Sequence, residues 1–103
     1  MEEKTIANQN VKLTSEGYLV DPSQWNKEIA IEIAKEEGID LSDLHFEVLE
    51  FLRKTHESGN TLTIRKVGKS GIVDIKGLYK LFPGGPLKYS SKIAGIPKPS
   101  SCV

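Results

Sequence analysis

Residues 21–38, DPSQWNKEIAIEIAKEEG, carry the clearest helix pattern in the chain. Asp21 or Ser23 can cap the start of a helix there, and Gly38 can end it. Charged residues lie off a single apolar stripe at helical spacing. The stripe consists of Trp25, Ile29, Ala30, Ile33 and Ala34. This stretch therefore predicts an amphipathic helix that packs one face on a core.

A second helix is predicted to follow Ser42, which can act as its N-cap, and to end at residues 59–60, Gly-Asn. Its expected buried side is made of Leu44, Val48, Phe51 and Leu52. Together the two helices predict a core built mostly from Trp25, Phe51 and their aliphatic neighbours.

The segment before the first helix predicts a short β-hairpin. Residues 1–10 are polar, and we expect them to be frayed. Apolar residues between 11 and 20 flank the polar stretch 14–17, which ends in glycine and suits a tight turn. Because a two-stranded ribbon is unstable alone, this hairpin should lie on the helices.

The segment after the second helix predicts a helix-turn-helix-like unit. A short helix should end near Lys69, and another should span residues 74–82. Residues 72–75 fit either a strand or the approach to that second helix. Gly68 and Gly71 weaken the first helix by about 1 kcal/mol each relative to alanine. These glycines and the short connection weaken the case for a DNA-binding unit.

The chain ends in a short helix and a tail. Residues 87–94 predict the helix, and Gly95 should terminate it. Residues 95–103, GIPKPSSCV, hold two prolines, two serines and Cys102, the only cysteine. Such a segment offers little apolar surface, so we expect a protruding, flexible arm. Fully extended, it would carry the sulfur roughly 25 Å from Gly95.

The composition limits the class of protein. With 103 residues the chain should form one domain, residues 1–103. It has neither an apolar run of membrane-span length nor a signal-peptide pattern, so we expect a soluble, cytoplasmic protein with no membrane partner. One cysteine excludes an internal disulfide framework, and His45 and His56 show no metal-ligand spacing. We therefore expect no metal and no cofactor.

The charge is divided unevenly along the chain. Residues 1–52 hold four lysines and twelve acidic residues, a net charge of −8. Residues 53–103 hold ten Lys and Arg and two acidic residues, a net charge of +8. Either the halves attract one another within the fold, or the basic half faces an acidic partner, an anion or nucleic acid.

The tail resembles a known C-terminal signature. Residues 92–103, KIAGIPKPSSCV, are similar to the end of the DsrC/TusE family. That family contains gamma-subunit-like proteins of dissimilatory sulfite reductase and sulfur-relay proteins of tRNA thiolation. Further matches occur in the expected order: EGYL at 16–19 with Trp25, IR at 64–65, and LYKLFP at 78–83 with Gly85-Pro86 after it. With the predicted elements, this implies a mainly α (α+β) fold, a small orthogonal helical bundle with an N-terminal β-hairpin.

The resemblance implies sulfur chemistry at Cys102. A cysteine thiolate can accept sulfur as a persulfide and surrender the outer sulfur to an acceptor. Sulfite-reductase partners of the family carry a second cysteine where this chain has Ser91, and a hydroxyl cannot close a disulfide. The single-cysteine arm therefore looks like the TusE branch, which implies a carrier that works with donor and acceptor proteins.

Four cations are candidates for docking a partner or an anion. They are Lys92, Lys98, Arg65 and Lys80. The expected partners are a sulfur-relay complex and a tRNA-thiolating enzyme. Two alternatives stay open: a gamma-subunit-like partner of dissimilatory sulfite reductase, or a regulatory DNA-binding protein with Cys102 as a thiol sensor.

Overall fold

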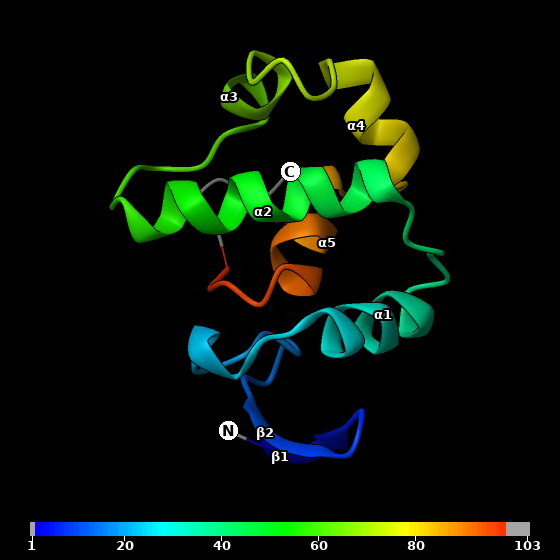
Figure 1. The fold of residues 1–103 in the computed structure, drawn as a ribbon, viewed down its shortest axis with the longest axis vertical. Helices are drawn as coiled ribbons and strands as arrows, with labels where there is room; N and C mark the ends of the chain where they lie inside the picture. The colour runs from blue at the N-terminus through cyan, green and yellow to red at the C-terminus, as the bar shows by residue number, and fades with distance from the viewer. Residues whose placement is uncertain (1, 99–103) are drawn as a thin grey trace.

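The computed structural model describes residues 2–98, and in that part an antiparallel hairpin precedes five α-helices (Figure 1). The elements are β1 (Glu2–Ile6), β2 (Gln9–Leu13), the 3-10 helix η1 (Pro22–Gln24), α1 (Lys27–Glu36), α2 (Asp43–Glu57), α3 (Ile64–Gly68), α4 (Ile75–Leu81) and α5 (Pro86–Ile93). The predicted class, a mainly helical protein with an N-terminal hairpin, is confirmed.

Helix α5 is the centre of the arrangement. It packs against α1 on one side and α2 on the other, while α3 and α4 lie together beyond α2 and the hairpin lies beyond α1 (Figure 1). Its buried side chains include Leu87 and Ile93, both fully inaccessible. The last helix before the tail is thus held from two sides.

The core differs in part from the prediction. Val48 and Leu52 are fully buried as expected, but Leu44 is 38% exposed. Trp25 and Phe51 are only partly buried and pack against the edge of the core. The large aromatic side chains in the interior are instead Tyr18 and Phe82.

The expectation that residues 1–10 are frayed is wrong for residues 2–10. Strands β1 and β2 pair there around a two-residue turn at Ala7 and Asn8, which have φ of 51° and 64°. Positive φ at both central residues is typical of a type I′ hairpin turn, which usually contains glycine, so the sequence signal is weak. At the predicted turn, residues 14–17, the chain does turn, but only an isolated bridge from Leu13 to Leu19 follows.

The predicted start of the first helix is also corrected. Asp21 caps η1, and α1 begins only at Lys27, where the side chain of Asn26 accepts from the amide of Ile29 at 2.9 Å. Trp25 therefore lies in the extended link before α1. From that link its indole can reach an element other than its own helix.

The remaining helix starts follow their capping residues. Ser42 caps α2 as predicted, Thr63 caps α3 and Asp74 caps α4. Residues 72–74 belong to the connection between α3 and α4 and not to a strand. None of the helices within residues 2–98 is long and apolar enough to cross a membrane.

Candidate functional site

Helix α5 delivers the C-terminal tail, and its end is fixed by close packing. Gly95 adopts φ +71°, and a Cβ atom there would lie 2.4 Å from Cδ1 of Trp25. Ile96 is 1% exposed, whereas Pro97 is exposed. The boundary predicted at Gly95 is thus two residues early: Gly95 and Ile96 belong to the body, and the arm begins at Pro97.

Two side chains hold the carbonyl groups at the end of α5. Nε1 of Trp25 donates to the Ile93 carbonyl at 2.8 Å. The guanidinium of Arg53 donates to the Ala94 carbonyl at 2.8 Å and, from its other terminal nitrogen, to the Pro22 carbonyl at 3.0 Å. Cζ of Arg53 lies 4.4 Å from the centroid of the Trp25 ring. We call this pair of side chains the Trp25–Arg53 clamp.

The clamp borders a cleft on the surface. Trp25 and Arg53 line it together with Glu50, Lys54 and Glu57, around about 410 Å³. Burial lowers the pKa of Arg53, and the negative charge of Glu57 partly opposes that shift. Within residues 2–98 no carboxylate forms an ion pair with Arg53, so its hydrogen bonds go to backbone carbonyls.

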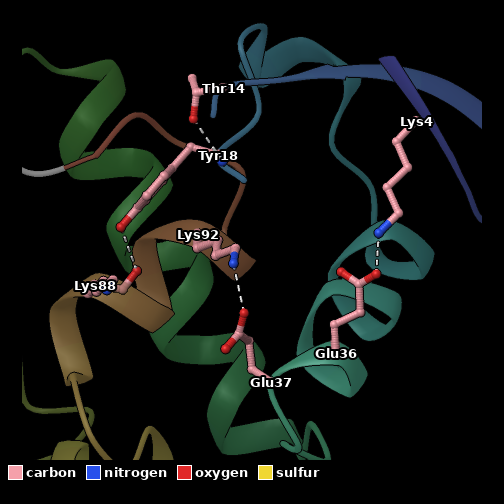
Figure 2. A network of polar contacts seen from close by, with 7 residues as sticks. All are labelled: Lys4, Thr14, Tyr18, Glu36, Glu37, Lys88 and Lys92. Atoms are coloured by element: carbon pink, nitrogen blue, oxygen red, sulfur yellow. Dashed lines mark hydrogen bonds and ion pairs between the residues drawn. The ribbon is translucent and has the colours of Figure 1, made fainter. Parts of the chain in front are cut away.

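Lys92, a predicted docking residue, lies in a partly buried ion pair. Its Nζ is 2.7 Å from Oε1 of Glu37, and the two side chains are only 19% and 21% exposed (Figure 2). The lysine stem also covers Gly17, where a Cβ atom would lie 2.8 Å from Cε of Lys92. Lys92 therefore joins α5 to the C-terminal end of α1.

Lys98, the last described residue, is paired as well. Its Nζ lies 2.8 Å from Oε2 of Glu16, in the turn before Tyr18. The hydrogen bond to Lys98 lowers the pKa of Glu16, and the positive charges of Lys98 and Lys88 act in the same direction. The Lys92–Glu37 and Lys98–Glu16 pairs both join the basic half of the chain to the acidic half. This agrees with the expectation that the two halves attract one another within the fold.

Arg65 and Lys80, the other two predicted docking residues, line two different clefts. Arg65 lines a cleft of about 460 Å³ on α3, together with Lys66, Lys69 and Phe51. Lys80 lines a different cleft, of about 350 Å³, that also includes Glu37 and His45. Glu37, the ion-pair partner of Lys92, thus also lines the Lys80 cleft, but no single one of the described pockets contains all four predicted cations.

Ser91, which the resemblance places at the position of a second cysteine, lies inside the body. It is fully buried, and its Oγ has no hydrogen-bond partner among residues 2–98. Cys102, the predicted persulfide carrier, falls in residues 99–103, outside the described part. A fully extended chain from Ile96 to Cys102 spans roughly 20 Å, which bounds the reach of the sulfur.

The histidines do not form a metal site in the described part of the chain. His45 is buried and binds the Leu81 carbonyl at 2.9 Å, while His56 is exposed. No group of three His, Cys, Asp or Glu that could hold a metal ion occurs within residues 2–98.

Sequence reasoning missed Arg53 and misplaced Trp25. The carbonyls that Arg53 binds lie 31 and 41 positions away in the sequence, so no local sequence pattern predicts the contact. Trp25 did appear in the resemblance, together with residues 16–19. The joint appearance of Trp25 and residues 16–19 in the resemblance could have indicated a shared contact, because both lie against the end of α5.

Comparison with known proteins gives a consistent result. The family model described as DsrC like protein matches residues 5–103. The chain is 45% identical to the sulfurtransferase TusE of Buchnera aphidicola subsp. Acyrthosiphon pisum, over 92% of this chain and 90% of the relative. It is 42% identical to the sulfurtransferase TusE of Escherichia coli K12, over 92% of this chain and 94% of the relative.

Solved structures agree with the sequence relatives. A crystal structure of dissimilatory sulfite reductase I contains a chain that is similar with a TM-score of 0.85 and 30% identity, covering 99% of this chain and 100% of that chain. The oxidised gamma-subunit of dissimilatory sulfite reductase (DsrC) from Archaeoglobus fulgidus has a TM-score of 0.81 and 30% identity, with the same coverage.

Proposed function

The chain belongs to the DsrC-like family, and from this premise we propose that it is a sulfur-relay carrier that bears its cargo on Cys102. The sulfurtransferase TusE relatives, more than 40% identical over almost the whole chain, support the relay branch of the family. The observation that carries the proposal is a single thiol placed six residues beyond Ile96, the last buried residue of the described range 2–98.

The proposed chemistry consists of two balanced exchanges. The Cys102 thiolate attacks the outer sulfur of a donor persulfide, the donor S–S bond breaks, and the donor leaves as a thiolate. Cys102 then carries the persulfide. An acceptor thiolate attacks its outer sulfur in the same way and regenerates Cys102. Neither exchange needs an oxidant or a reductant.

The carrier should rely on its partners to activate the thiol. Lys92 and Lys98 are the cations nearest to Cys102 in the sequence, and both form ion pairs with glutamates. Their charges are therefore largely compensated. A thiolate becomes reactive where the surroundings favour it, so we place the activation in the partner's pocket.

The finer assignment of partners follows the family resemblance. We propose an upstream relay complex as donor and a tRNA-thiolating enzyme as acceptor, with Arg65 and Lys80 as docking cations on the body. A free thiol survives in a reducing compartment, so the proposed location is the cytoplasm.

A partner role on a sulfite reductase is the second candidate. It is favoured by the structural relatives, which are a chain of dissimilatory sulfite reductase I and the gamma-subunit of dissimilatory sulfite reductase from Archaeoglobus fulgidus. Ser91 counts against the redox form of that role, because this chain has no second cysteine to pair with Cys102.

Intact-mass analysis after incubation with a persulfide donor tests the carrier proposal. We expect one added sulfur on the wild-type chain and none on Cys102→Ser. A second measurement uses extract of an Escherichia coli strain lacking its own TusE, with radiolabelled cysteine as sulfur source. The wild-type chain should restore label in tRNA, and Cys102→Ser should not. A wild-type chain that takes up no sulfur would refute the proposal; one that takes it up but restores no label would refute the tRNA branch.

A further inference from the structure

Arg53 makes an unusual contribution to the end of α5. The last carbonyls of a helix lack partners within the helix, and water or a glycine-based C-cap usually satisfies such groups. Gly95 already supplies that C-cap, since the amides of Gly95 and Ile96 bond back to the carbonyls of Lys92 and Ser91. Arg53 binds a further carbonyl, that of Ala94.

The contact takes the guanidinium partly out of water. Burial lowers the pKa of Arg53, which means that its charged form is partly desolvated. No carboxylate within residues 2–98 forms an ion pair with it, and the negative charge of Glu57 opposes only part of the shift. Its planar fork instead joins Pro22 and Ala94, two backbone groups far apart in the sequence, and stacks on Trp25. Such a bridge fixes the relative position of two segments.

We propose that Arg53 is a positioning residue for sulfur delivery: it fixes, with Trp25, the point from which the arm leaves the body. This inference rests on the proposed carrier function. With the clamp in place, the tether to Cys102 starts after Ile96 and spans six residues. If the last turn of α5 detaches, the tether starts near Lys92 and spans ten residues.

The longer tether has a calculable effect. The effective concentration of a tethered group at a docked partner falls roughly as the −3/2 power of tether length, so ten residues instead of six lower it about twofold to threefold. The reactivity of the thiol toward a small molecule does not depend on the tether. Loss of the clamp should therefore slow delivery to proteins and leave the reaction with small reagents unchanged.

The chain offers a matched set of variants. Arg53→Gln removes the fork and the charge, whereas Arg53→Lys keeps the charge over Trp25 but cannot bridge both carbonyls. Lys54→Gln is the control, because it removes the same charge one residue away, from an exposed side chain lining the same cleft. Gly95→Ala disrupts the clamp from the other side, since the new Cβ would collide with Trp25.

Three measurements decide the question, each made below the unfolding transition of every variant. The chain has one tryptophan and one cysteine, so time-resolved energy transfer from Trp25 to a dye on Cys102 reports the distribution of arm positions. Reaction of Cys102 with a disulfide reagent reports its intrinsic reactivity. Label in tRNA, in extract of Escherichia coli lacking TusE, reports delivery at limiting carrier.

Arg53→Gln and Gly95→Ala should both broaden the distance distribution and slow delivery about twofold to threefold, with the reagent rate unchanged. Arg53→Lys should lie between Arg53→Gln and wild type, and Lys54→Gln should match wild type. Delivery by Arg53→Gln at the wild-type or Lys54→Gln rate would overturn the inference, as would a parallel fall in the reagent rate. If the wild-type chain itself restores no label, the tRNA branch of the proposed function fails, and the distance distributions of the variants still test the role of Arg53 separately.

Discussion

At the scale of single residues, Ser91 places a hydroxyl group in the interior without a hydrogen-bond partner among residues 2–98. A buried donor that forms no hydrogen bond costs about 1–3 kcal/mol of desolvation. We therefore expect Ser91→Ala to raise the free energy of unfolding by about 1 kcal/mol, measured by urea denaturation.

Ser90 is the matched control for this prediction. It is also fully buried in α5, but its Oγ donates to the Leu87 carbonyl at 3.2 Å. Ser90→Ala removes a bond as well as a hydroxyl, so it should gain less stability than Ser91→Ala or lose some. If Ser91→Ala is the more destabilising of the two, the Ser91 hydroxyl is bonded in solution.

Individual functional residues were predictable only where a motif contained them. Lys92 and Lys98 belong to the tail signature, yet their partners Glu37 and Glu16 lie 55 and 82 residues away. Arg53 belongs to no motif at all. A local sequence pattern can identify a cationic residue, but it cannot identify a partner that is distant in the sequence and comes close only in the folded chain.

At the scale of elements, His45 connects the start of α2 to the end of α4. Its Nδ1 accepts from the Ser42 amide at 3.0 Å, and its Nε2 lies 2.9 Å from the Leu81 carbonyl. Its ring also packs edge-on against Phe82, with centroids 5.1 Å apart. The Ser42 amide can only donate, so Nδ1 of His45 is the acceptor. Nε2 therefore carries the proton and donates to the Leu81 carbonyl.

We expect His45→Ala to lower the free energy of unfolding by about 2–3 kcal/mol, because it removes a cap, an interhelical hydrogen bond and an aromatic contact. His56→Ala should change it by less than about 0.5 kcal/mol, since His56 is exposed at the last turn of α2. Urea midpoints of both variants measure the difference. Equal midpoints would mean that His45 does not connect the two helices.

Helices were the most predictable elements. Ser42 as a cap and Gly95 as a terminator act locally, and the structure has them where the sequence predicts. The hairpin was misplaced because its turn uses Ala7 and Asn8 at positive φ, a conformation that glycine usually provides. The start of α1 was misplaced because Asn26 and Asp21 are both competent caps, and only packing of Trp25 on α5 selects between them.

At the scale of the whole molecule, two ion pairs join the basic second half of the chain to the acidic first half. Lys92 pairs with Glu37 (Figure 2), and Lys98 pairs with Glu16. The pair of the hairpin residue Lys4 with Glu36, by contrast, lies within the acidic half. The Lys98 pair is more exposed than the Lys92 pair, with side chains 42% and 50% exposed. Water and salt screen such a pair, so it should hold the base of the arm only weakly.

The Lys98 pair predicts a specific pH dependence. Lys98 lowers the pKa of Glu16, so Lys98→Gln should raise that pKa toward its ordinary value, which a carboxyl NMR titration measures. A carboxyl whose folded pKa is lowered stabilises the fold above its unfolded pKa and loses that contribution as the pH falls through the folded pKa. The difference in unfolding free energy between wild type and Lys98→Gln should therefore be present at about pH 7, decrease in acid as Glu16 is protonated, and shrink in about 1 M salt. A difference that persists in acid would show that Lys98 stabilises the protein through contacts other than Glu16.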